Sequence, residues 1–225
     1  EWLVAQEVEE VVMESTAQYW RPVWDALERS WGPRRRQREG AGAMSGTLHV
    51  AQAQSNRGPS GRKKDFLDAE RLVKRLVAQE LTLSFVPDPE QRLWRTVMRR
   101  KYQVTRNRVQ VQNRLECLLE EAHPKLSSLV SDLLGLSARR MLQAIADGET
   151  DAAKVTALAD ARLRATPDQL SDAFGACADL HPVYRRLLTM TLEDVRRIDE
   201  QIDVLDREMA GLLRPHQAAV QRLAA

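Results

Sequence analysis

The sequence has few residues that could cross-link it or bind a soft metal. Its two cysteines, Cys117 and Cys177, are too few and too far apart for a disulfide framework or a zinc site, which fits a reducing compartment. Histidine is also scarce, and its four copies show no paired spacing: His49, His123, His181 and His216. None of them is therefore expected to act as a catalytic base or as a metal ligand.

Long hydrophobic runs are missing as well. No apolar stretch approaches the roughly 20 residues that span a bilayer, and no signal peptide is visible. We therefore expect no membrane partner. The chain begins at Glu1, without a methionine and inside an apolar, helix-like pattern, so we expect its natural beginning to lie further upstream.

The composition is that of a folded protein with long exposed helices. Of the 225 residues, 43% are hydrophobic and 29% are charged, and the length suits one large or two small domains. Because the net charge is only +2, the total says little about partners, and the distribution of charge along the chain matters more.

The start of the chain indicates an α/β arrangement. Residues 8–14 are typical of a short strand, and Ser15 or Thr16 can cap the helix that follows. That helix is expected to carry one apolar face, made of Trp20, Val23, Trp24 and Leu27. Glu14 thus lies at the carboxyl end of a strand, where open α/β sheets place their sites.

The stretch from Gly32 to Lys64 is rich in Gly, Pro, Ser and Arg, and it holds eight basic residues against a single acid. A second short strand is predicted inside it, at residues 47–54. We interpret the rest as a solvated loop rather than a formed binding site. The pattern from Asp65 to Glu80 then predicts a helix whose apolar face consists of Leu72, Leu76 and Val77.

Two prolines in residues 85–90 predict a domain boundary, which divides the chain into an α/β part, residues 1–86, and an all-α part, residues 87–222. Apolar residues repeat every seven positions in two segments of the second part: Val97, Val104, Val111 and Leu118, and Leu188, Val195, Ile202 and Met209. This pattern predicts an antiparallel helical coiled-coil arm. A small helical insert joins its helices, with Gly135, Gly148, Pro167 and Gly175 as the expected helix ends.

The two predicted arm helices differ in charge. Residues 91–115 hold eight basic residues and no acid, whereas residues 193–208 hold seven acids and three arginines. These charges fit two interpretations, which the sequence leaves open. The helices complement each other across the coil, or the first helix presents a basic face to a phosphate backbone. The candidate nucleic-acid contacts on that helix are Arg99, Arg100, Lys101, Arg106 and Arg108.

Three acids form the candidate catalytic and metal site: Glu14, Asp65 and Asp68. Asp65 and Asp68 are three residues apart, so they share one face of the predicted helix. Mg²⁺ takes carboxylate, water and phosphate oxygens as ligands, and two such ions can assist transfer at phosphorus. First-turn acids are also explained by the helix macrodipole, and the spacing alone favours that simpler explanation.

Three blocks of sequence, in order, point to one family. They are "VVMESTAQYWRPVWDALE", "VAQAQSNRGPSGRKKDFLDAERLVKRL" and "NRLECLLEEAHPKLSSLVSDLLGLSARRMLQAIADGETD". Together they resemble the transposases of the insertion sequence 110 family over most of the chain. The resemblance implies a RuvC-like, ribonuclease-H-like N-terminal domain with four acidic metal ligands (DEDD). A coiled-coil arm and a domain with a nucleophilic serine would follow.

The resemblance also implies roles for individual residues. Glu14 would be the second acid of the tetrad, Asp65 the third and Asp68 the fourth, and they would hold Mg²⁺ near the scissile phosphate. Arg62 and Lys63 would lie beside nucleic acid. The implied partners are DNA, a guide RNA encoded in the element, and further copies of the chain bound through the arm. The implied location is the bacterial cytoplasm, at the nucleoid.

Three departures from the family pattern affect the expected activity. No aspartate precedes Asp25 to serve as the first acid, and residues 31–47 do not match the family's short apolar link. The chain also stops where the family continues into the serine-bearing domain. We therefore expect a truncated transposase that is inactive on its own. The alternative is a non-catalytic coiled-coil module for nucleic-acid binding or oligomerisation; a stand-alone junction-resolving nuclease would need all four acids.

Overall fold

The computed structural model describes residues 2–31, 46–56, 65–122, 129–130, 132–160, 163–175 and 180–224. The chain divides into two compact units, Glu1–Asp88 and Pro89–Ala225. Each unit has its own core, and each is described separately. No helix among the described residues is both long enough and apolar enough to cross a membrane.

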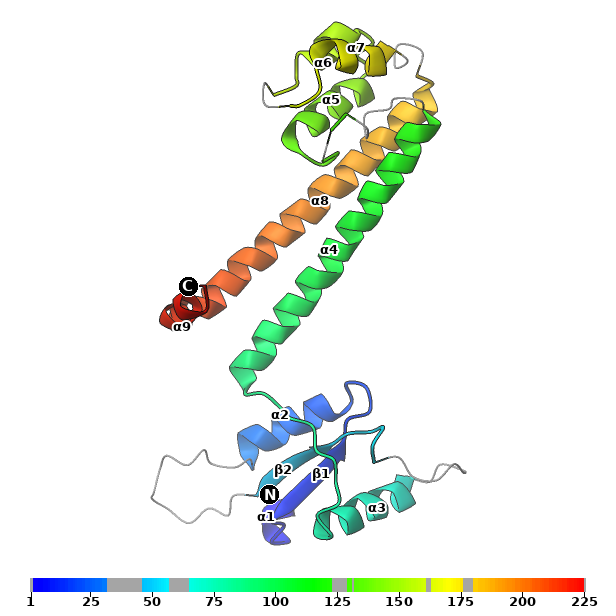
Figure 1. The fold of residues 1–225 in the computed structure, drawn as a ribbon. Helices are drawn as coiled ribbons and strands as arrows, with labels where there is room; N and C mark the ends of the chain where they lie inside the picture. The colour runs from blue at the N-terminus through cyan, green and yellow to red at the C-terminus, as the bar shows by residue number, and fades with distance from the viewer. Residues whose placement is uncertain are drawn as a thin grey trace. The chain divides into compact units, whose positions relative to one another are not determined.

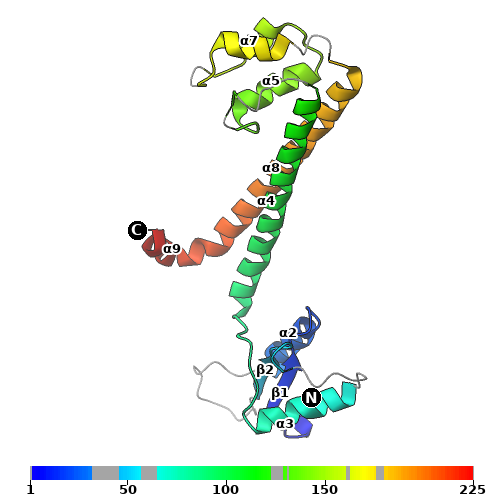
Figure 2. The ribbon, with the colours of Figure 1, turned by 45° about the vertical axis from the view of Figure 1, so that its right-hand side comes forward.

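The N-terminal unit is built on a small parallel sheet. Its elements are α1 (Trp2–Ala5), β1 (Glu10–Glu14), α2 (Trp20–Ser30), β2 (Thr47–Ala51) and α3 (Asp65–Val77). The strands pair in register from Glu10 opposite Thr47 to Glu14 opposite Ala51. Parallel strands need a crossover connection, and the segment that carries α2 supplies it. Helices α2 and α3 lie on opposite sides of the sheet (Figures 1 and 2), which is consistent with the expected ribonuclease-H-like class.

The free edge of β2 is extended by residues 82–84. The Ser84 N–H donates to the Val50 carbonyl at 2.7 Å, and the Gln52 N–H donates to the Thr82 carbonyl at 2.9 Å. Asn56, which is 1% exposed, fastens this junction. Its Nδ2 donates to the carbonyls of Gln52 and Thr82, and its Oδ1 accepts from the Thr82 N–H. The Asn56 side chain thus links residue 52, just beyond β2, to residue 82 of the added segment, where strand pairing between the two backbones ends.

Tryptophan side chains form most of the core of this unit. Trp24 and Trp31 are buried with Leu48 and Val50 of β2, and the ring of Trp20 meets that of Trp24 edge-on at 5.9 Å. Gly46 is buried against Trp31. A Cβ at position 46 would lie 1.9 Å from a carbon of that ring, so only glycine fits where the chain enters β2.

Several local predictions need correction. α2 begins at Trp20 with Tyr19 at its N-cap and no side-chain cap hydrogen bond, so neither Ser15 nor Thr16 caps it. The Ser15 hydroxyl instead accepts from the Ala53 N–H beyond β2. The predicted apolar faces were also too wide. Val23 of α2 is 50% exposed and Val77 of α3 is 79% exposed, because only one narrow stripe of each helix reaches the sheet.

The C-terminal unit is entirely helical. Its elements are α4 (Pro89–Glu121), α5 (Leu136–Ala146), α6 (Ala152–Thr156), α7 (Pro167–Gly175), α8 (Pro182–Leu213), a 3₁₀ turn (Arg214–His216) and α9 (Gln217–Ala224). α4 and α8 run antiparallel side by side, and α5, α6 and α7 cover the end where α4 stops and α8 starts (Figures 1 and 2).

The predicted helix ends of the insert are confirmed. Gly135 is the N-cap of α5, and Gly148 follows α5 with φ of +102°, a conformation that side-chain-bearing residues rarely adopt. Pro167 and Gly175 are the first and last residues of α7.

The core of this unit lies beneath the insert. Buried side chains from five helices form this core: Val111, Leu115 and Leu119 of α4, Met141, Leu142 and Ile145 of α5, Val155 of α6, Leu170 and Phe174 of α7, and Leu188, Leu192 and Val195 of α8. Away from the insert, the seven-residue repeats continue but their side chains are only partly covered, as at Val97, Ile202 and Met209. The pair of long helices is therefore best packed at the end next to the insert, and a regular coiled coil along its whole length stays a prediction.

Candidate functional site

Glu14 occupies the carboxyl end of β1. It is half-buried, and its carboxylate accepts a hydrogen bond of 2.5 Å from the Thr16 hydroxyl. The chain beyond it is held to β2, because the Ser15 N–H donates to the Ala51 carbonyl at 2.9 Å. The fold thus fixes the position of Glu14 at the edge of the sheet where the sequence predicts a site.

Asp65 and Asp68 lie in the first turn of α3, where the helix macrodipole favours acids. Asp65 is exposed. Asp68 is half-buried and accepts from Arg71 Nη1 at 2.7 Å, one turn further along the helix. α3 packs against β1, the strand that ends at Glu14. An ordinary local ion pair therefore satisfies the better-buried aspartate of the two.

The three acids do not form a metal centre within the described residues. No group of three or more His, Cys, Asp or Glu side chains that could hold an ion occurs in that part of the chain. In this arrangement Thr16 and Arg71 engage two of the three carboxylates. Arg62 and Lys63, the predicted neighbours of nucleic acid, lie outside the described residues.

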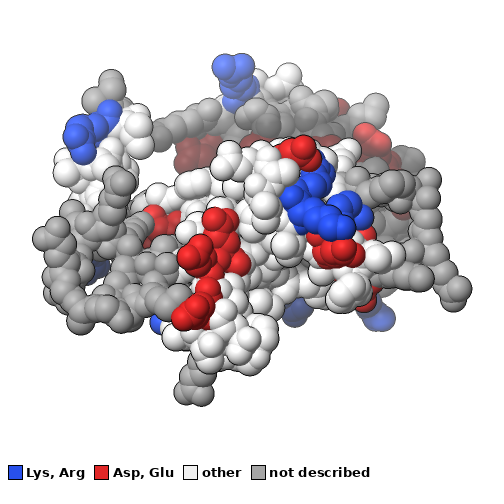
Figure 3. Space-filling model, turned by 90° about the horizontal axis from the view of Figure 1, so that it is seen from below, with Lys and Arg blue, Asp and Glu red and all other residues white. Residues whose placement is uncertain are grey.

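On the face of the N-terminal unit that Figure 3 draws, charges of both signs lie around α3. Figure 3 shows basic side chains over α3 bordered by acidic ones, while other acids gather over the chain near α1. The pairs Arg71–Asp68 and Lys74–Glu70 account for part of this interleaving. Within the described residues, a nucleic-acid surface is therefore better sought in the C-terminal unit.

The predicted nucleic-acid contacts on α4 divide into two groups. Lys101 and Arg108 face α8, where they pair with Asp206 and Asp199, and the Arg108–Asp199 pair measures 2.8 Å. Arg99, Arg100 and Arg106 are exposed. The two interpretations of the charge pattern are compatible, because they involve different faces of α4. Lys101 and Arg108 complement the acids of α8, and the exposed arginines are left for a phosphate backbone.

Asp199 also forms an ion pair with an arginine of the insert. Arg139 Nη2 of α5 lies 2.5 Å from Oδ2 of Asp199, while Arg108 donates to Oδ1 of the same carboxylate. Burial by itself would raise the pKa of Asp199, but the hydrogen bonds from Arg108 and Arg139 outweigh it and hold the pKa below its ordinary value. The carboxylate is therefore ionised wherever this unit is folded near neutral pH.

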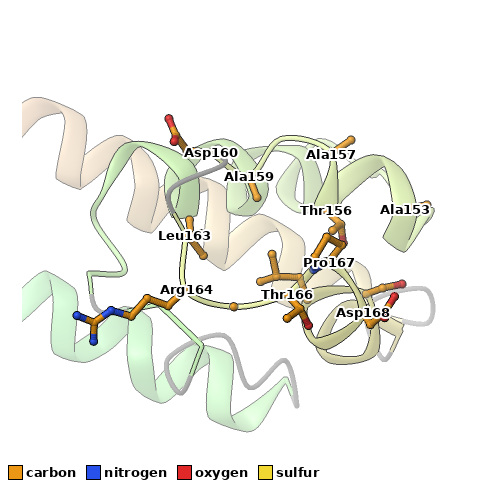
Figure 4. Close-up of a pocket in the computed structure, with 13 residues that line it drawn as sticks. Ala153, Thr156, Ala157, Ala159, Asp160, Leu163, Arg164, Thr166, Pro167 and Asp168 are labelled. Carbon is orange, nitrogen blue, oxygen red and sulfur yellow. The ribbon is translucent and has the colours of Figure 1, made fainter.

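A cavity of about 710 Å³ opens between α6 and the start of α7. Figure 4 shows Thr156, Thr166 and Pro167 close together at its floor, while Arg164 extends away from them. Its described lining contains two aspartates, Asp160 and Asp168, but no His or Cys. Ser171 and two threonines add hydroxyl groups to this lining, and we assign no chemistry to the cavity.

Comparison with known families then decides the identity of the chain. The family model of the DEDD transposases of insertion sequence 110 matches residues 1–124, more than half of the 225. The chain belongs to the insertion sequence 110 transposase family. Searches of curated proteins and of solved structures returned no match.

The family match spans the whole N-terminal unit and all of α4. Transposases of this family act on DNA and typically use divalent metal, so DNA is the partner that membership indicates. Glu14, Asp65 and Asp68 all lie within the matched range, as do the arginines of α4. Their roles as ligands and contacts remain predictions, because no group of metal ligands occurs in the described part of this transposase.

Sequence reasoning missed two residues that organise this transposase chain. Asn56 stood inside the second quoted block, and a buried, fully bonded side chain is not visible in a local pattern. Arg139 stood inside the third, where "SARRML" gave no hint that its partner lies 60 residues later on α8. The opposite charges of residues 91–115 and 193–208 are the sequence signal that includes Asp199.

Proposed function

We propose that this transposase chain acts on nucleic acid through two surfaces, an acidic one in the N-terminal unit and a basic one on α4. The observation that carries the proposal is the family match over residues 1–124, which includes all three acids and the basic helix. DNA is the substrate. The guide RNA encoded in the element is the second nucleic-acid partner.

Mg²⁺ is the proposed metal for Glu14, Asp65 and Asp68, since hard divalent cations prefer carboxylate oxygens. The packing of α3 against β1 supports a shared location for these acids. Because the described residues contain no complete group of ligands, no cleavage step is derived through the metal. Binding would require Asp68 to exchange Arg71 for the cation.

For the same reason, we propose that the 225-residue chain on its own does not cleave or join DNA strands. Two-metal chemistry at phosphorus needs several carboxylates that converge on the ions. In the described residues, the better-buried aspartate is held by an arginine instead.

The basic surface is proposed to bind phosphates through Arg99 and Arg106. Neither has an acidic partner within the described residues, whereas Lys101 and Arg108 are neutralised by α8. Arginines that lack a carboxylate partner can neutralise phosphates and so release the cations condensed on the nucleic acid, which gives an affinity that depends steeply on salt.

Self-association through the long helices is part of the proposal. Away from the insert, apolar side chains stay exposed on both helices: Leu93, Met98 and Val204 are each close to half or more accessible. Exposed apolar side chains of this kind, beside the seven-residue repeats, support pairing with a second copy of the chain.

Titration calorimetry with MgCl₂ tests the acidic surface. We expect weak binding that Glu14→Gln and Asp65→Asn each reduce, while Glu9→Gln, an exposed acid beside β1, leaves it unchanged. Equal binding by all four proteins would contradict the metal assignment.

Fluorescence anisotropy with a labelled DNA duplex tests the basic surface. The double variant Arg99→Gln/Arg106→Gln should lower the slope of log affinity against log salt by about two, one for each lost phosphate contact. Arg114→Gln removes an exposed arginine from a different side of α4 and serves as the control. An equal loss in the control would contradict the assignment of this face.

The second candidate function is a non-catalytic module that binds nucleic acid. The observation that favours it is the missing metal group in the described residues beside an intact basic helix. It predicts that affinity for nucleic acid is the same with Mg²⁺ and with EDTA at matched ionic strength, and that Asp65→Asn leaves it unchanged.

A further inference from the structure

One exposed aromatic side chain lies within the arginine face of α4. Arg95, Arg99, Tyr102 and Arg106 follow one another at spacings of four, three and four residues, which places them along a single stripe of the helix. At about 1.5 Å per residue, the stripe is roughly 16 Å long. The side chains that face α8 lie on the opposite side of the helix, at Val104, Val111 and Leu115.

Tyr102 takes no part in the core of its unit. Its side chain is 64% exposed, and the guanidinium of Arg106 lies over its ring at 6.0 Å from the centroid. An aromatic ring placed this way contributes little to packing. It does present a flat apolar face to solvent, next to a cation that is already oriented over it.

The charge around this ring is not neutralised. Residues 91–115 contain no acid, and no carboxylate in the described ranges lies within ion-pair distance of Arg95, Arg99 or Arg106. Lys101 and Arg108, which point toward α8, are neutralised by its acids. The stripe therefore combines three unpaired cations with one accessible ring.

Cations that alternate with an exposed ring suit a ligand with phosphates and accessible flat faces. Aromatic side chains stack on unpaired bases of any sequence, while nearby basic residues follow the backbone. In a duplex, the base faces are already stacked on one another. A duplex would therefore contact the arginines through its phosphates but would offer no free base to stack on Tyr102. An acidic protein segment would also use only the arginines.

We propose that this stripe binds an unpaired strand of nucleic acid, with a base stacked on Tyr102 and phosphates held by Arg99 and Arg106. The proposal rests on the proposed function, that α4 binds nucleic acid, and it narrows the ligand to a strand whose bases are free. Unpaired DNA and unpaired RNA share this chemistry.

The test is fluorescence anisotropy of the full chain with labelled strands of about 20 nucleotides, long enough to cover a site of the size that single-strand binders use. The probes are oligo-dT, oligo-rU, an abasic strand of the same length, and a duplex. Tyr102→Ala should weaken binding to the base-bearing unpaired strands about tenfold, the effect of losing one stacked base, and change binding to the abasic strand and the duplex less than about twofold. Tyr102→Phe keeps the ring and should bind like the wild type.

Asn107→Ala removes another exposed side chain of α4, on a different side of the helix from the stripe, and is the matched control. Circular dichroism melting checks that the variants fold, which the exposure of Tyr102 leads us to expect. An effect of Tyr102→Ala on oligo-dT alone, or on oligo-rU alone, would support the proposal and identify the strand as DNA or RNA.

The remaining outcomes count against it. If Arg99→Gln/Arg106→Gln weakens binding but Tyr102→Ala acts equally on the abasic strand, or not at all, the stacking proposal fails and the proposed function stands. If polyglutamate displaces the unpaired strand as well as unlabelled oligo-dT does, the stripe is a site for acidic protein segments. If no probe binds at low salt, both proposals fail.

Discussion

Arg139 of α5 and Asp199 of α8 form an ion pair of 2.5 Å, and the other carboxylate oxygen of Asp199 accepts from Arg108 of α4 at 2.8 Å. All three side chains are about 30% exposed, so water screens them only in part. One carboxylate thus ties the insert to both long helices. Arg139 belongs to the "SARRML" segment, and it holds α5 to the long helices through this contact.

Replacement of Asp199 by Ala should destabilise the C-terminal unit by about 1–3 kcal/mol, because two partly buried arginines lose their shared acceptor. Urea unfolding followed by the far-ultraviolet circular dichroism of the helices measures the change. Asp194→Ala removes an exposed acid from the same helix and should stay within about 0.5 kcal/mol of the wild type. A similar loss in both variants would mean that the contacts of Asp199 with the two arginines do not account for the change, since alanine has the higher helix propensity at both positions.

The same contact predicts a dependence on pH. The pKa of Asp199 in the folded state lies below its ordinary value of 3.8, so between the two the unfolded state binds more protons. The stabilisation by Asp199 is therefore complete above the ordinary pKa and is lost as the pH falls through the lower, folded pKa. The difference in unfolding free energy between wild type and Asp199→Ala should shrink on acidification. A difference that stays constant as the pH falls well below 3.8 would contradict this assignment.

Much of the helical unit could be predicted because its signals are local. Seven-residue repeats located both long helices, and glycine and proline marked the ends of the short ones. Lys101 and Arg108 lie between the repeating apolar residues of α4. In the structure they meet acids 105 and 91 residues away, and only the register between the two helices makes that pairing visible.

The candidate acidic site could be predicted only as a set of residues. Resemblance to the family singled out Glu14, Asp65 and Asp68, but whether they converge depends on tertiary contacts that no spacing encodes. Arg71, one turn after Asp68, is a local competitor for its carboxylate that the sequence did contain. Ion pairs between residues i and i+3 are common on helix surfaces. The sequence pattern therefore could not show whether Asp68 pairs with Arg71 or binds a metal.

Asn56 should be the most sensitive polar residue of the N-terminal unit. Asn56→Ala would remove the side-chain hydrogen bonds to the carbonyls of Gln52 and Thr82 and to the Thr82 N–H around a position that is 1% exposed, at a cost of about 1–3 kcal/mol. Tryptophan fluorescence during urea unfolding reports on this unit, where Trp24 and Trp31 are buried. Asn107→Ala, an exposed position on α4, is the control and should leave the transition unchanged.

Two glycine-to-alanine substitutions should act in opposite directions. Gly46→Ala places a methyl group 1.9 Å from the ring of Trp31, so the ring must move within a packed core, at a cost of about 1–3 kcal/mol. Gly211 lies inside α8, and nothing lies within 4 Å of the place that a methyl group would take there. Gly211→Ala should therefore stabilise the unit by up to about 1 kcal/mol, the difference in helix propensity. Thermal melting of both variants checks the signs. Stabilisation by Gly46→Ala would show that Trp31 does not pack against the start of β2.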